Sequence, residues 1–188
     1  MRVIAGQARN IPLCTVPGMD TRPTTDRIKE TLFNICQPYL ADCRFLDLFA
    51  GSGAIGIEAL SRGADHAVFV EQNPKAAACI RKNLQAAKLE GKASLLVTDV
   101  ESGLGKLRDQ EPFDFIFMDP PYGKGLERKA IAFLSHSGLV KEDTWIILET
   151  RIGEPLEYAE EYGFSVLRLK KYKTNQHVFL TRAGEDTI

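Results

Sequence analysis

The chain has 188 residues, of which 44% are hydrophobic and 26% are charged, and its formal net charge is −1. No window approaches the ~20 consecutive apolar residues of a membrane span, and the N-terminus lacks the apolar core of a signal peptide, so we expect a cytoplasmic protein without membrane association. The four cysteines form neither a C-x-x-C pair nor zinc-type spacing with histidine, which argues against a metal site: Cys14, Cys36, Cys43 and Cys79.

The beginning of the chain is predicted to form an extension ahead of the main sheet. Alternating apolar residues in the first twenty positions favour a small hairpin. Residues 24–37 then place Ile28, Leu32 and Ile35 on one face of an amphipathic helix, which ends ahead of Pro38. We expect residues 1–188 to form a single, monomeric domain, in which residues 1–40 are an RNA-facing extension and residues 41–188 are the catalytic core.

Apolar runs alternate with helix-forming segments through the rest of the chain. Strands are predicted at 44–49, 67–71, 92–97, 113–118 and 144–148, and helices at 54–61, 74–87, 101–107 and 126–135. Only five residues separate the last two strands, 164–170 and 176–181, so these must form an antiparallel hairpin. The pattern predicts an α/β fold: a Rossmann-like, seven-stranded, mostly parallel sheet with an antiparallel C-terminal hairpin.

Gly51-Ser-Gly53-Ala-Ile-Gly56 is a G-x-G-x-x-G sequence placed after a predicted strand and before a predicted helix. That context is typical of a nucleotide-binding turn. Glu71 follows at the end of the next strand, where a carboxylate can accept hydrogen bonds from both hydroxyl groups of a ribose. The sequence therefore predicts a cofactor that contains adenosine.

Two further acidic residues favour a cationic cofactor. Asp47 lies just inside the end of the first strand of the sheet, and Asp99 follows the third, where it can reach an adenine amino group or cap the next helix. A diphosphate would be repelled by such carboxylates, whereas S-adenosylmethionine carries an ammonium and a sulfonium and no phosphate. We therefore favour S-adenosylmethionine, with S-adenosylhomocysteine as product, over NAD.

Asp119-Pro-Pro-Tyr122 follows the apolar run 113–118 and therefore stands at the end of a buried strand. Two prolines make this loop stiff, and ligands of open α/β sheets bind outside the carboxyl ends of the strands. The loop offers an acceptor carboxylate, the carbonyl of Pro120 and an aromatic face. This combination suits a planar group that bears an NH2.

Basic residues gather near both ends of the chain. Five lie in residues 1–29 and five in residues 162–182, the latter without any acidic residue. If these segments meet in space they would form a positive face suited to a phosphate backbone, although lysines that protect a sheet edge give the same pattern. The histidines His66, His136 and His177 are isolated in sequence, so we expect them at the surface or in the core.

Together these motifs resemble the class I S-adenosylmethionine-dependent methyltransferases over residues 45–122. Asp47-Leu-Phe-Ala-Gly-Ser-Gly53 is similar to their glycine-rich motif, and Asp119-Pro-Pro-Tyr122 to their amino-methylating tetrapeptide. Within that class, Thr21-Arg-Pro-Thr-Thr-Asp-Arg-Ile-Lys-Glu-Thr-Leu-Phe-Asn34 and Gly56-Ile-Glu-Ala-Leu-Ser-Arg-Gly-Ala64 resemble the RsmD family. That family methylates the exocyclic N2 amine of a guanine in small-subunit ribosomal RNA.

The resemblance implies a role for each matching residue. Asp119, Pro120, Pro121 and Tyr122 would be catalytic: the Asp119 carboxylate and the Pro120 carbonyl accept hydrogen bonds from the amine, and Tyr122 stacks on the flipped base. The implied cofactor contacts are Asp47, Phe49, Gly51, Ser52, Gly53, Glu71, Gln72, Asp99, Val100 and Asp119. The implied RNA contacts are Arg22, Thr24, Arg27, Lys124, Arg128, Lys171 and Lys173.

The partner implied is ribosomal RNA, within a small-subunit particle, without a metal. Adenine-N6 and other amino methyltransferases share the tetrapeptide, so the choice of base depends on the resemblance. An NAD-dependent oxidoreductase is the remaining alternative, and it leaves Asp119-Pro-Pro-Tyr122 without a role.

Overall fold

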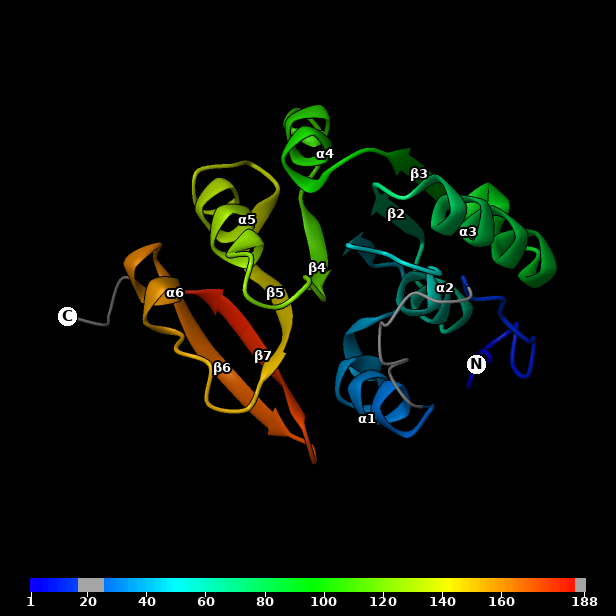
Figure 1. Ribbon diagram of the computed structural model, residues 1–188, viewed down its shortest axis with the longest axis horizontal. Helices are drawn as coiled ribbons and strands as arrows, with labels where there is room; N and C mark the ends of the chain where they lie inside the picture. The colour runs from blue at the N-terminus through cyan, green and yellow to red at the C-terminus, as the bar shows by residue number, and fades with distance from the viewer. Residues whose placement is uncertain (17–25, 185–188) are drawn as a thin grey trace.

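The structure is a computed structural model that describes residues 1–16 and 26–184. A seven-stranded sheet with the order β3-β2-β1-β4-β5-β7-β6 crosses its centre (Figure 1). Its strands are β1 (Arg44–Leu48), β2 (His66–Glu71), β3 (Ala93–Val97), β4 (Phe113–Met118), β5 (Val140–Arg151), β6 (Phe164–Lys171) and β7 (Asn175–Arg182). β7 inserts between β5 and β6 and is antiparallel to both, while β3, β2, β1, β4 and β5 are parallel. The predicted mostly parallel sheet with an antiparallel C-terminal hairpin is confirmed.

Helices cover both faces of the sheet (Figure 1). They are α1 (Asp26–Cys36), α2 (Ala54–Ser61), α3 (Pro74–Ala87), α4 (Val100–Leu107), α5 (Leu126–Ser135) and α6 (Glu157–Glu161), with short 3-10 turns at Gln37–Tyr39 and Glu90–Lys92. α1, α2 and α3 pack their apolar side chains with one face, and α4, α5 and α6 with the other. None of the helices described is long and apolar enough to cross a membrane.

Three elements differ from the sequence prediction. β5 begins four residues early, at Val140, because its pairing with β4 is irregular: Phe113 pairs with Val140, but Phe115 pairs with Trp145. The short helix α6 was not predicted. The N-terminal hairpin is reduced to one bridge between Arg2 and Pro12, because the N–H groups of Ile4 and Ala5, which would continue the segment's pairing, donate to Glu58 instead.

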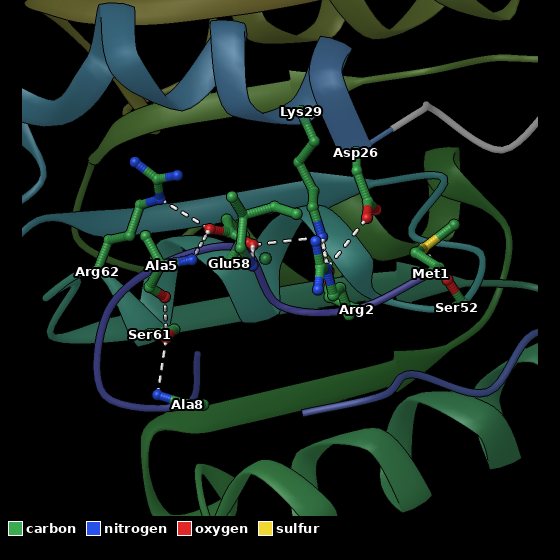
Figure 2. Close-up of polar contacts among 12 residues, drawn as sticks. Met1, Arg2, Ala5, Ala8, Asp26, Lys29, Ser52, Glu58, Ser61 and Arg62 are labelled. Atoms are coloured by element: carbon green, nitrogen blue, oxygen red, sulfur yellow. Dashed lines mark hydrogen bonds and ion pairs between the residues drawn. The ribbon is translucent and has the colours of Figure 1, made fainter. Parts of the chain in front are cut away.

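The N-terminal segment is held on α2 by a buried carboxylate, Glu58 (Figure 2). Glu58 Oε2 accepts from Ile4 N at 2.8 Å and Oε1 from Ala5 N at 3.0 Å. The same group pairs with Lys29 Nζ of α1 at 3.2 Å and with Arg62 Nε at 2.8 Å. Burial lowers the pKa of Lys29, and the neighbouring Glu58 opposes that shift. One side chain of α2 therefore fixes both the first residues of the chain and α1.

Candidate active site

A cavity of about 1690 Å³ opens at the carboxyl ends of the parallel strands. α1 supplies one wall, and the connection between β6 and β7 supplies another. Its lining includes Arg27, Phe49, Gly51, Glu71, Gln72, Asp99, Val100, Asp119, Pro120, Pro121, Tyr122, Lys124, Glu149, Arg151, Lys170, Lys171, Tyr172, Lys173 and Asn175. Segments from both ends of the chain therefore enclose one site.

The glycine-rich turn after β1 has the backbone that its sequence predicts. Gly51 and Gly53 have φ angles of 55° and 77°, a region that residues with a Cβ rarely adopt. Gly56 lies in α2, where an added Cβ would meet the ring of Phe69 at 2.4 Å. The third glycine of the motif therefore serves close packing of the helix on β2, as in nucleotide-binding folds.

Glu71 ties the end of β2 to this turn. Its Oε2 accepts a hydrogen bond from Gly51 N at 2.7 Å, and its Oε1 accepts from Asn73 N at 2.7 Å. The carboxylate lines the cavity and is fixed before any ligand arrives. Each oxygen of an ionised carboxylate has a second acceptor position, so the ribose contact predicted for Glu71 is compatible with these bonds.

Asp47 lies beneath the turn, outside the residues that line the cavity, and is 1% exposed. It accepts a hydrogen bond from Gly56 N at 3.0 Å. Burial raises the pKa of Asp47 to about 7, with a further contribution from Glu71, and the Gly56 N–H opposes the shift. Asp47 can therefore act on a ligand in the cavity only through its charge or by holding the turn in place. Ser52 and Gly53 also lie outside the lining.

Asp99 lines the cavity and caps α4. Its Oδ1 accepts from Ser102 N at 2.9 Å and its Oδ2 from Ser102 Oγ at 2.7 Å. The hydrogen bonds from Ser102 lower the pKa of Asp99. Asp99 therefore caps a helix, as one interpretation of the sequence held, and also places a carboxylate in the cavity lining, as the other required. Gln72 and Val100 line the cavity beside it.

The loop 119–122 projects into the cavity from the end of β4. Pro120 is buried and Tyr122 is 43% exposed, with the Arg151 guanidinium 4.7 Å from the centre of its ring. Burial raises the pKa of Asp119 to about 8, and the charges of Glu149 and Asp47 act in the same direction. A carboxyl group with such a pKa can take up and release protons near neutral pH.

The sequence analysis missed a polar cluster on β5 and β7. Glu149 lies in the cavity wall and binds Asn175 Nδ2 at 2.5 Å and His177 Nε2 at 3.1 Å. Tyr172 OH lies 3.0 Å from His177 Nδ1. His177 is fully buried and packs edge-on against Phe117, so of the two places predicted for it, the surface or the core, it takes the core, and it also contacts Glu149. An acidic residue at a strand end was the signal used for Glu71 and Asp119, and it applies equally to Glu149.

The basic residues divide into two groups. Arg27, Lys124, Lys171 and Lys173 line the cavity together with Lys170, so the two basic segments of the sequence do meet there. Lys29, by contrast, is buried against Glu58. Arg128 is exposed outside the cavity lining, and its guanidinium lies 4.7 Å from the centre of the Tyr158 ring. Arg22 and Thr24 fall outside the described residues.

The cavity therefore separates charge: carboxylates cluster at the strand ends, and cationic side chains occupy the outer walls. Such a site attracts a cationic cofactor to its floor and a polyanion to its rim. Within residues 1–16 and 26–184, no group of three His, Cys, Asp or Glu side chains is placed to hold a metal ion.

Comparison with known proteins identifies the family. The family model described as "Conserved hypothetical protein 95" matches residues 1–181. "Ribosomal RNA small subunit methyltransferase D" of Haemophilus influenzae is 37% identical over 165 residues, covering 86% of this chain and 84% of that protein. The chain belongs to the ribosomal RNA small subunit methyltransferase D family. The resemblance drawn from the sequence motifs is confirmed.

Two further members of this group are similar over nearly the whole chain. "Putative rRNA methyltransferase YlbH" of Bacillus subtilis is 41% identical over 172 residues, covering 91% of this chain and 92% of that protein. The solved structure of "Putative methyltransferase yhhF" from Escherichia coli superposes with a TM-score of 0.85 at 32% identity, covering 98% of this chain and 99% of that one. The fold is the class I methyltransferase fold.

Proposed function

We propose that this methyltransferase uses S-adenosylmethionine to methylate the exocyclic N2 amine of a guanine in small-subunit ribosomal RNA. The observation that carries the proposal is the position of Asp119-Pro-Pro-Tyr122 in a cavity with an acidic floor and a basic rim. Family membership supports ribosomal RNA as the substrate, because relatives at 37% and 38% identity carry that name. Such an enzyme would act in the cytoplasm on a ribosomal particle, as a monomer.

The residues at the ends of β1, β2 and β3 fit S-adenosylmethionine. The turn at Gly51, the carboxylate of Glu71 and the Asp99 side chain would hold the adenosine, and the buried charge of Asp47 favours a cationic ligand over a pyrophosphate. When bound, this cofactor supplies a methyl group on a positively charged sulfur, from which a nucleophile can displace it. The NAD-dependent alternative would bring two phosphates to the same carboxylates.

The tetrapeptide would activate the amine. A guanine amine is a poor nucleophile because its lone pair is delocalised into the ring. Hydrogen bonds from that NH2 to the Asp119 carboxylate and the Pro120 carbonyl favour a pyramidal nitrogen and fix its lone pair in the direction of attack. Transfer leaves a proton in excess, and the pKa of Asp119, raised by burial to about 8, suits that carboxylate to receive it.

The rim would bind the RNA. Arg27 of α1, Lys171 at the end of β6 and Lys173 of the β6–β7 connection line the same cavity from opposite ends of the sequence. We propose that these side chains, with Lys124, contact backbone phosphates around an extruded base. Tyr122 would stack on that base with the face opposite Arg151. We infer that α1, which supplies one wall of the cavity, is the part of the extension 1–40 that faces the RNA; none of residues 1–16 lines the cavity.

Mass spectrometry of ribosomal RNA from cells with and without this chain tests the activity. We expect one methylguanosine of the small subunit to disappear with the chain and to return when it is restored. An unchanged modification map would refute the proposal. A missing methyladenosine would show that the target base is adenine and not guanine. The map also identifies the target nucleotide.

The role of Asp119 is tested with purified protein and small subunits from the cells that lack the chain. Asp119→Ala should abolish methyl transfer, while calorimetry should find nearly the same affinity for S-adenosylhomocysteine. Weakened cofactor binding with normal single-turnover transfer would assign Asp119 to the cofactor instead. NAD, titrated under the same conditions, should not bind.

A further inference from the structure

A second carboxylate stands beside the catalytic one. Met118 of β4 and Leu148 of β5 are partners in the parallel sheet, so Asp119, which follows β4, and Glu149, which is still within β5, occupy neighbouring positions at the usual strand spacing of about 4.8 Å. Both line the cavity. Methyl transfer to an amine, as described above, uses only Asp119, and it leaves Glu149 without a role.

The contacts of Glu149 fix it as a hydrogen-bond acceptor. Asn175 Nδ2 donates to Oε1 at 2.5 Å, and His177 Nε2 lies 3.1 Å from Oε2. With Glu149 ionised, His177 donates from Nε2 and accepts the Tyr172 O–H at Nδ1, over 3.0 Å. Glu149 is 6% exposed and His177 fully buried, so these partners hold the carboxylate rigidly. An ionised carboxylate has about four acceptor positions, two on each oxygen, so Glu149 can accept a hydrogen bond from a ligand in addition to holding these partners.

Asn175 lines the cavity beside Glu149. Its Nδ2 donates to Glu149, and its Oδ1 is buried without a hydrogen-bond partner among the described residues, so Oδ1 is not open to a ligand. The acceptors next to Asp119 are therefore those of Glu149, and a base that fits there must present a donor.

Guanine and adenine differ at the position next to the amine. In guanine the N2 amine neighbours N1–H, a second donor, so the two groups together match two adjacent carboxylates. In adenine the N6 amine neighbours N1, which carries a lone pair and would face a carboxylate without a proton between them. A site built for a donor rejects an analogue that lacks it by a large factor, because its own buried groups are left unpaired.

We propose that Glu149 selects guanine by accepting a hydrogen bond from N1–H while Asp119 holds the N2 amine. Asn175 and His177 are positioning residues that keep the Glu149 carboxylate in place. This inference rests on the proposed function, because it assigns the choice of base within the same reaction.

The test uses the target nucleotide that the modification map identifies. Small-subunit RNA is prepared with guanine or with 2-aminopurine at that nucleotide; 2-aminopurine keeps the 2-amine, but its N1 is an acceptor. For the wild-type enzyme, kcat/KM should be lower on the 2-aminopurine substrate than on the guanine substrate by about 10²-fold or more. For Glu149→Gln, the ratio of kcat/KM on guanine to kcat/KM on 2-aminopurine should fall below about tenfold, because an amide can donate N–H to N1.

Two variants control the interpretation. Glu149→Asp keeps a carboxylate and should keep the preference for guanine, with a lower overall rate. Glu142→Gln lies on the same strand, exposed and outside the cavity lining, and should behave as wild type on both substrates. Affinity for S-adenosylhomocysteine and the unfolding temperature of each variant show whether the site is intact.

The inference is overturned if Glu149→Gln, folded and able to bind S-adenosylhomocysteine, loses the same factor on both substrates. Wild-type enzyme that methylates both substrates equally would also overturn it, and that result leaves the proposed function standing. Absence of any guanine methylation by the wild type refutes the proposed function itself, and the modification map reveals this beforehand.

Discussion

Asp119 combines two properties at the scale of a single residue: it begins the loop that we propose holds the amine, and it lies where its charge is disfavoured. Burial raises its pKa to about 8, whereas the ordinary value is 3.8. Between those pH values the folded chain keeps a proton that the unfolded chain has released, so the free energy of unfolding falls as the pH rises through this window. Burial of the Asp119 carboxyl therefore lowers the free energy of unfolding at neutral and alkaline pH.

Asp119→Asn should therefore stabilise the ligand-free protein at pH 8 to 9 and have little effect near pH 4. A shift of one pKa unit corresponds to ~1.4 kcal/mol, and solvent at the cavity reduces the total, so we expect a gain of about 2 kcal/mol. Urea unfolding across this pH range measures it. Asp109→Asn, on an exposed carboxyl beyond α4, is the control, and an equal gain in both variants would contradict the assignment.

Proton release on cofactor binding follows from the same carboxyl groups. The pKa values of Asp47 and Asp119 are raised to about 7 and about 8, so both groups hold protons at neutral pH before a ligand binds. A sulfonium nearby favours their ionised forms and lowers these pKa values. At pH 7, S-adenosylmethionine should release more protons than S-adenosylhomocysteine, which lacks the sulfonium charge. Calorimetry in buffers of different ionisation enthalpy counts them; equal release for the two ligands would contradict the prediction.

At the scale of elements, Glu58 decides how α1 is held. Removing one partner of a buried ion pair leaves the other charge uncompensated, at a cost of roughly 3 to 5 kcal/mol. Glu58→Gln should therefore lower the free energy of unfolding by about 3 kcal/mol and weaken RNA binding, because α1 carries Arg27 into the cavity wall. Denaturant unfolding and RNA titration measure the two effects.

Glu101→Gln, in an exposed ion pair of α4, is the control for the loss of the buried Glu58 carboxylate. Glu101 pairs with Lys129, and both side chains are about 60% exposed, so its loss should cost less than about 1 kcal/mol. A variant Glu58→Gln no less stable than this control would show that the buried network contributes nothing to the attachment of α1.

Strands with a continuous apolar run could be predicted from the sequence, whereas the pairing between strands could not. The apolar runs that became β1, β2 and β4 are buried on both faces, which gives parallel strands their continuous hydrophobicity. α6 and the first residues of β5 lack such runs and depend on tertiary contacts. Glu149 had the same local signal as Glu71 and Asp119, an acidic residue at the end of a predicted strand, but its contacts depend on the pairing of β5 with β4 and β7, which that signal does not include.

At the scale of the whole molecule, the site is assembled from both ends of the chain. Arg27 lies on α1, near the beginning of the chain. Lys171 ends β6 and Lys173 follows it before β7, near the end of the chain, yet all three line one cavity. The sequence showed the two basic segments but not their convergence, since that requires β7 to insert beside β5. Lys29 belongs to the first basic segment of the sequence, but it is buried in an ion pair with Glu58 and contributes no charge to the cavity wall.

The basic rim predicts a salt dependence. Replacing Lys171 and Lys173 together by Ala should weaken RNA binding and reduce the slope of log K against log salt by about 1.4, at roughly 0.7 per phosphate contact on single strands. Affinity for S-adenosylhomocysteine should not change. Replacing Lys82 and Lys92, which are exposed and outside the cavity lining, is the control. An unchanged slope in the first variant would remove these lysines from the RNA surface.

The insertion of β7 between β5 and β6 also bears on how the protein is made. Synthesis delivers β7 after every other strand described, and with it come Asn175 and His177, the partners of Glu149. The wall of the cavity beside Asp119 therefore cannot be complete until the last strand has been synthesised.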